Sequence, residues 1–213
     1  MGKVPRRQSK VADRHASLRG VIASIRDLIE LSVTVEAPDE ALVAAGRHIA
    51  RAVAVLAPFP RGAGHRPLPA ATGSADPSTP MASDADPEHL SPLAPPLRIR
   101  WEPPRIVGEV TFGSAYEGPP GCVHGGFIAA AFDHVFSVMN VMLGTPGPTA
   151  SLALQYRRPT PLRVPLRVEG WRDRVEGRRI HVRGRLLVAD QVTVEADAVF
   201  VVARDDHSTR PAP

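Results

Sequence analysis

The sequence contains a single cysteine, Cys122, in 213 residues. A disulfide within the chain is therefore excluded, which fits a reducing compartment and predicts a cytoplasmic location. Histidine, cysteine and carboxylate residues do not cluster at the spacing of metal ligands. Neither a phosphate-binding loop nor a dinucleotide fingerprint is present. We therefore expect no metal and no cofactor.

Long hydrophobic runs are also scarce, because charged residues interrupt every apolar run before Pro58. No signal peptide and no transmembrane helix is expected there. The segment 123–143 is apolar enough and long enough for a membrane span, but it contains Asp133, His134 and Asn140, which are costly in lipid. We therefore predict a buried helix and no stable membrane insertion.

Aromatic residues make up only 5% of the chain, against 43% hydrophobic residues overall. The formal charge is +4 and the pI is about 10.0, which suits a nucleic acid, an anionic membrane or a phosphorylated small molecule. Residues 157–185 contain ten arginines against three acidic residues. They predict either a solvated sheet face or phosphate binding, in which Arg157 and Arg158 are the first candidates. Since Trp171 stands nearly alone as a stacking aromatic there, no nucleic-acid partner is expected.

Proline divides the chain, because ten of its 23 prolines lie in residues 58–98. This stretch has no apolar period and is predicted to be a disordered linker. Residues 1–57 before it carry apolar side chains at helical spacing in two segments, which predicts an N-terminal helical hairpin. The hairpin is interpreted as a packing or dimerisation appendage, with a basic helix on a membrane surface as the alternative.

Residues 99–204 are predicted to form the globular domain, and residues 205–213 a C-terminal tail. A strand-like segment at 106–112 precedes the long apolar helix. After Gly147, apolar and polar residues alternate in four segments, which predicts an antiparallel meander with one wet face. Because the helix is apolar nearly all round, the economical α+β arrangement is a curved antiparallel sheet wrapped around a long central helix.

The start of the predicted helix carries the most chemical information. Gly125 and Gly126 leave backbone amides open to a carbonyl oxygen that is gaining charge. Asp133 lies seven residues further on, on the same helix face, and Ser137 and Asn140 continue that face. Asp133 is either a catalytic carboxylate or a buried residue paired with an arginine, and the helix alone leaves both open. His124 suits a local hydrogen bond better than a dyad with the nearby cysteine.

Two further motifs add to this pattern. The run His124-Gly125-Gly126 with Asp133 nine residues after the histidine, followed by Thr149-Ala150-Ser151-Leu152 and Tyr156-Arg157-Arg158-Pro159, resembles the PaaI-like branch of the hotdog thioesterase superfamily. The resemblance covers about residues 99–204. It implies the hotdog fold, an acyl-CoA thioesterase activity, and a homodimer or homotetramer whose active sites form between subunits. CoA would then be part of the substrate rather than a cofactor.

The resemblance also implies residue roles. Asp133 would act as general base or nucleophile, the Gly126 amide would polarise the thioester carbonyl, and His124 would shape the loop. Thr149 of a partner subunit would help to position water. The expected substrate contacts are Gly125, Ser137, Ser151, Arg157 and Arg158.

Two alternatives to an acyl-CoA thioesterase remain. One is a thioesterase that acts on acyl groups bound to a carrier protein. The other is a non-catalytic acyl-CoA-binding or regulatory protein that uses the N-terminal helices for interaction. A hotdog hydratase is disfavoured because its aspartate and histidine signature is not visible.

Overall fold

The computed structural model describes residues 6–59 and 91–202. Most of the predicted linker and the whole predicted tail lie outside the described residues, so both stay predictions. The elements in chain order are α1 (Arg6–Thr34), α2 (Asp39–Leu56), β1 (Arg98–Glu102), β2 (Arg105–Val110), the 3-10 helix η3 (Ser114–Tyr116), α3 (Gly125–Met142), β3 (Thr149–Tyr156), β4 (Leu166–Glu176), β5 (Arg179–Val188) and β6 (Gln191–Val201).

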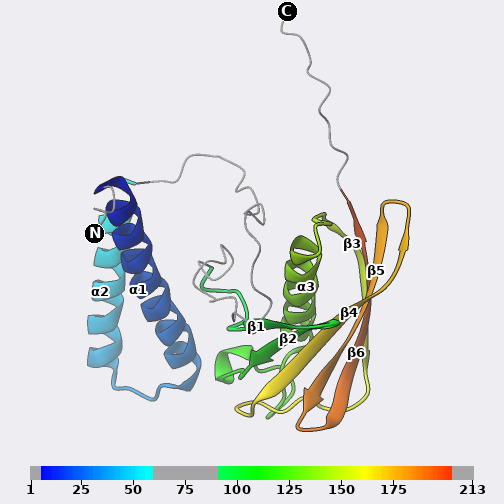
Figure 1. The fold of residues 1–213 in the computed structure, drawn as a ribbon. Coiled ribbons are helices and arrows are strands. Elements are labelled where there is room, and N and C mark those ends of the chain that lie inside the picture. The colour runs from blue at the N-terminus through cyan, green and yellow to red at the C-terminus, as the bar shows by residue number, and fades with distance from the viewer. Residues whose placement is uncertain (1–5, 60–90, 203–213) are drawn as a thin grey trace, which may run out of the picture.

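The N-terminal helical hairpin is confirmed, and its two helices differ in how they pack (Figure 1). Helix α1 contacts η3 and buries Ile22, which is 5% exposed. Helix α2 buries no residue, and the side chains of Leu42, Ile49 and Val53 are 43–62% exposed. The domain therefore anchors α1, whereas the apolar stripe of α2 faces outward.

The six strands form one antiparallel sheet in the order β1-β2-β4-β5-β6-β3. The sheet curves around α3, which lies against one of its faces (Figure 1). This is the arrangement predicted from the apolar helix and the alternating segments. Among the described strands, β3 and β1 are the two edges.

Helix α3 is the centre of the hydrophobic core. It is long and apolar enough to cross a membrane by length and composition alone, yet its apolar side chains pack against the sheet. Phe132 and Phe136 are fully buried and their rings lie 5.6 Å apart. They meet Phe112 and Phe200 from the sheet side in the same cluster. The prediction of a buried helix agrees with this packing.

Two features of the sheet differ from the sequence prediction. Strand β1 was not predicted, although its polar and apolar residues alternate, because it is only five residues long and prolines flank it at both ends. The meander holds for β4, β5 and β6, but β3 pairs with β6 at the edge instead of with β4. The residues between β3 and β4 include three prolines, which lack the amide that a tight hairpin would need.

The described end of the predicted linker, residues 91–97, contacts both the hairpin and the domain. The Arg26 guanidinium donates a hydrogen bond to the Ser91 carbonyl at 2.9 Å. Leu97 is 1% exposed and belongs to the core. Ordered packing on this side therefore begins ahead of residue 99, where the globular domain was predicted to start.

Candidate active site

The N-terminus of α3 is closed by two side chains. The His124 Nδ1 atom accepts a hydrogen bond from the Gly126 amide at 2.9 Å, so His124 is the N-cap of the helix. The Tyr156 hydroxyl donates to the Gly125 carbonyl at 3.0 Å. A Cβ atom at Gly125 would lie 2.7 Å from that hydroxyl, so glycine is needed here for the close approach of Tyr156. The Gly126 amide can therefore hold a carbonyl oxygen only after the imidazole of His124 turns away.

Asp133 lies on the accessible side of α3. The residues of α3 that are exposed or half-exposed between its start and Ser137 include Gly126, Ala130 and Asp133, which are spaced as one helical face. The Thr149 hydroxyl donates a hydrogen bond to Asp133 Oδ1 at 2.5 Å. In the described part of the chain, no arginine, lysine or histidine lies within ion-pair distance of this carboxylate. The arginine-paired alternative for Asp133 therefore does not describe this structure.

Thr149 reaches Asp133 from the same chain. It is the first residue of β3, sixteen residues after Asp133, and β3 runs beside α3. The resemblance implied that Thr149 would come from a partner subunit. The hydrogen bond within one subunit differs from that expectation, because the edge strand follows α3 directly and lies against it.

Gly126 and Asp133 are too far apart for both to contact one carbonyl group directly within a single chain. Seven residues of α-helix separate them, which is about 10 Å along the axis. An oxyanion donor works at about 3 Å from the oxygen, and an attacking atom at about 3–3.5 Å from the carbon. Both sequence-predicted groups are present and on one face, but one subunit does not bring them into direct contact with the same group.

The remaining predicted residues lie along the same edge. Ser137 is half-exposed one turn after Asp133, and Ser151 is exposed on β3. The Arg157 guanidinium forms an ion pair with Glu195 at 2.7 Å, and Arg158 donates to the Val192 carbonyl at 2.9 Å. Both arginine side chains are exposed. Of these two arginines, Arg158 is therefore the one without a carboxylate partner among the described residues.

Four of the six arginines in β4 and β5 pair with acids: Arg167, Arg174, Arg183 and Arg185. Glu169 is 4% exposed and accepts from Arg105, Arg167 and Arg185 at 2.8–3.2 Å. Burial by itself raises the pKa of the Glu169 carboxyl, but hydrogen bonds and charge from Arg167 and Arg185 outweigh it and hold the pKa below its ordinary value. The outer face of the sheet around Glu169 is therefore an ion-pair network, as expected for a solvated sheet surface.

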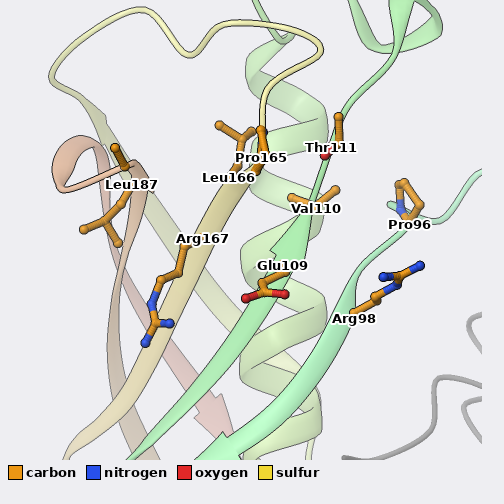
Figure 2. A pocket seen from close by; sticks show the side chains of 10 residues that line it. Pro96, Arg98, Glu109, Val110, Thr111, Pro165, Leu166, Arg167 and Leu187 are labelled. Atoms are coloured by element: carbon orange, nitrogen blue, oxygen red, sulfur yellow. The ribbon is translucent and has the colours of Figure 1, made fainter.

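A hollow of about 580 Å³ lies on that outer face, away from Asp133. Figure 2 shows Arg98, Glu109 and Arg167 around it, with Val110 and Leu166 at the strands beneath. None of its lining residues belongs to α3 or β3. Since Arg167 is already bound to two carboxylates, the hollow offers an anion less charge than its arginines suggest.

Two polar residues near α3 received no role from the sequence. Tyr156 was part of the quoted motif, and its hydroxyl joins the end of β3 to the start of α3. Asn140 was placed on the face of Asp133, but it is 1% exposed and its side-chain amide has no partner among the described residues. The only sequence signal for Tyr156 was its place at the exposed end of an alternating strand. No sequence signal indicated that Asn140 would be buried without a partner in the described part of the chain. Within the described ranges, no cluster of three metal-ligating side chains occurs.

Known proteins match this domain. Residues 120–195 match the family model of the thioesterase superfamily. The acyl-coenzyme A thioesterase THEM4 of Xenopus laevis is 32% identical over 91 residues, which are 42% of this chain and 41% of that protein. THEM4 of Mus musculus is 33% identical over 99 residues, 46% of this chain and 43% of that protein. The chain thus matches less than half the length of these curated relatives.

A solved structure extends the likeness beyond the domain. The crystal structure of a thioesterase superfamily protein, 29% identical, superposes with a TM-score of 0.71 over 86% of this chain and 94% of its own. Because the described residues after position 90 are only 112 of 213, this overlap includes the N-terminal helices. The α3 helix and its six-stranded sheet therefore have the hotdog fold, and residues 120–195 within them are similar to the thioesterase superfamily.

Proposed function

We propose that this chain hydrolyses acyl-CoA thioesters, with Asp133 as the general base that activates water. The observation that carries the proposal is the pair formed by Asp133 and Thr149. Its carboxylate is half-exposed, fixed by one hydroxyl, and free of a neutralising arginine in the described structure. Such a carboxylate keeps lone pairs for a water molecule. The curated relatives named acyl-coenzyme A thioesterase support the substrate class.

The chemistry needs only groups that this chain has. Asp133 takes a proton from water as the water oxygen bonds to the thioester carbon. A backbone amide at the start of α3 stabilises the negative charge on the carbonyl oxygen. The carbon–sulfur bond then breaks with its electron pair left on sulfur, and Asp133 returns the proton to the thiolate. A thioester is activated enough for this route without a metal.

The separation of Gly126 from Asp133 supports a site shared between two copies. If two α3 helices lie antiparallel, Asp133 of one copy approaches the α3 N-terminus of the other. The exposed edge strand β3 supports the same pairing, since its outer backbone groups are open to a second β3. His124 of the second copy would then release the Gly126 amide when substrate binds.

The activity is tested by Asp133→Asn. We expect the parent to hydrolyse at least one member of a panel of acyl-CoAs, and the variant to lose about 100-fold or more in kcat, the range for a general base. Asp197→Asn is the matched control, because Asp197 is an exposed carboxylate paired with Arg183 on the outer face. Parental turnover by Asp133→Asn would contradict the proposal. CoA binding without turnover in both proteins would instead indicate a binder.

The shared site is tested by mixing two inactive variants. Asp133→Asn removes the base, and Gly126→Pro removes the amide at a first-turn position where proline is tolerated. If each site takes Asp133 from one copy and Gly126 from the other, co-expression restores about a quarter of parental activity, because half of the dimers are mixed and each has one intact site. No recovery would place both groups in one chain.

A further inference from the structure

The N-terminal helix α1 holds the loop that leads into the candidate active site. The two carboxylate oxygens of Glu30 each accept a backbone amide of η3, from Ser114 and from Ala115, both at 2.8 Å. These residues are more than 80 positions apart in the sequence. Glu30 therefore satisfies the exposed amides at the start of a short helix that has no side-chain cap of its own.

Several features show that this contact is specific. A Cβ atom at Gly113 would lie 2.6 Å from the Glu30 carboxylate, so glycine leaves the room that the carboxylate uses. Arg163 donates to the Ser114 hydroxyl, and its charge favours ionised Glu30. Partial burial opposes ionisation, but the two amides, the Ser114 hydroxyl and Arg163 together lower the pKa of Glu30. The contact is thus a bidentate, charge-assisted one.

The loop that Glu30 holds continues directly to the α3 N-terminus. The Tyr116 carbonyl, at the end of η3, accepts the His124 amide at 2.8 Å. The Tyr116 ring packs edge-on against Phe127 in the first turn of α3, with centroids 4.8 Å apart. His124 in turn binds the Gly126 amide. Direct contacts therefore run from Glu30 to the amide that is expected to polarise the thioester.

We infer that Glu30 is a positioning residue for the α3 N-terminus, so that the N-terminal helix is a working part of the active site. The catalytic consequence rests on the proposed function. The positional consequence does not rest on the proposed function, because it concerns only how well the backbone of residues 113–127 is ordered. The helices preceding the hotdog domain then have a task beyond packing: they set the orientation of the oxyanion-binding loop.

The full chain carrying Glu30→Ala or Glu30→Gln tests the inference. The control is Asp27→Ala, an exposed carboxylate one turn earlier on α1. We expect Glu30→Ala to lower kcat about tenfold with KM within about twofold, which is less than the roughly 100-fold that a 1 Å misplacement of a catalytic group can cost. Glu30→Gln, which keeps one acceptor oxygen, is expected to lie between the alanine variant and the parent. Asp27→Ala is expected to match the parent.

Amide hydrogen exchange over residues 113–127 supplies the second readout. Glu30→Ala is expected to speed exchange in this segment and to leave exchange in β4–β6 at parental rates. Parental exchange there would overturn the inference, and so would faster exchange with unchanged kcat. If the parent hydrolyses no acyl-CoA, the proposed function fails, and the exchange result still decides whether Glu30 positions the loop.

Discussion

Two acidic residues in two regions of this domain meet opposite environments. At the edge where α3 meets β3, Asp133 is half-exposed and accepts one hydroxyl, that of Thr149. On the outer face of the sheet, Glu169 is nearly fully buried beneath three arginines. The sequence left catalysis and an arginine pair open for Asp133; Glu169 has the arginine pairing, and Asp133 has the environment that the proposed catalysis would need.

The difference between these regions shows how pairing with arginine limits what a carboxylate can do. The lone pairs of Glu169 are taken up by guanidinium groups, so it can neither accept a proton readily nor approach a substrate. Asp133 has one fixed oxygen and capacity left over. The first arrangement stabilises a sheet surface, and the second suits a base.

Breaking the buried network has the largest expected effect on stability. Glu169→Gln leaves three arginines facing a neutral amide, and since these arginines are partly exposed and can be rehydrated, we expect a loss of about 2 kcal/mol in the free energy of unfolding. Denaturant unfolding measures it. Glu109→Gln is the control, since Glu109 is half-exposed and pairs with Arg100 alone. Turnover per folded molecule should stay parental, the reverse of Asp133→Asn.

Removing the hydroxyl partner of Asp133 is expected to cost less than removing Asp133. Thr149→Ala takes away the hydrogen bond that orients the carboxylate, and kcat should fall about tenfold, equivalent to one hydrogen bond to a charged group. Thr149→Ser keeps the hydroxyl and should recover most of the rate. Steady-state kinetics of the three proteins decide this, and equal rates in all of them would separate Thr149 from catalysis.

Acid should weaken the contribution of the Glu169 ion pairs to the stability of the fold. The folded-state pKa of Glu169 lies below its ordinary value of 4.5, so its contribution to stability is complete above that pH and is lost as the pH falls through the folded-state pKa. The melting-temperature difference between parent and Glu169→Gln should therefore shrink below about pH 4. Thermal melts between pH 7 and pH 3 test it, and a constant difference would mean that the carboxylate charge is not what stabilises this face.

The smallest expected effect is on the KM for acyl-CoA, and it concerns the two arginines that follow edge strand β3. Arg158 donates only to a carbonyl, whereas Arg157 is paired with Glu195. If exposed arginines bind the phosphates of CoA, Arg158→Ala should raise KM for acyl-CoA about threefold with kcat unchanged, and Arg157→Ala should raise it less. The rise should disappear at high salt, where charges are screened. An equal KM in both variants and the parent would remove these residues from the binding site.

The sequence predicted most of the elements because their patterns are local. Alternation marked β5 and β6 within one or two residues, and the apolar run marked α3. It missed β1, because this strand is only five residues long and lies between prolines. It also paired β3 with β4, whereas β3 pairs with β6 at the edge of the sheet. Alternation identifies the two faces of a strand but does not identify the strand beside it.

For the candidate site, the residue types were predictable and their relations were not. The motif around His124 and Asp133 pointed to a face of α3 that is accessible in the structure. It did not reveal that His124 occupies the Gly126 amide, that Thr149 binds Asp133 within one chain, or that Glu30 holds the loop. Each of these contacts joins atoms whose approach depends on how separate segments fold together.

What the sequence determined by itself is the set of local patterns: helix and strand periodicity, the glycines at the start of α3, and a carboxylate on its small-residue face. Only the tertiary structure decided which carboxylate is neutralised and which stays available. The physical reason is that backbone periodicity depends on neighbours along the chain, whereas the charge state of a carboxylate depends on neighbours in space. Among the described residues, those neighbours are arginines from three segments for Glu169 and a single threonine for Asp133.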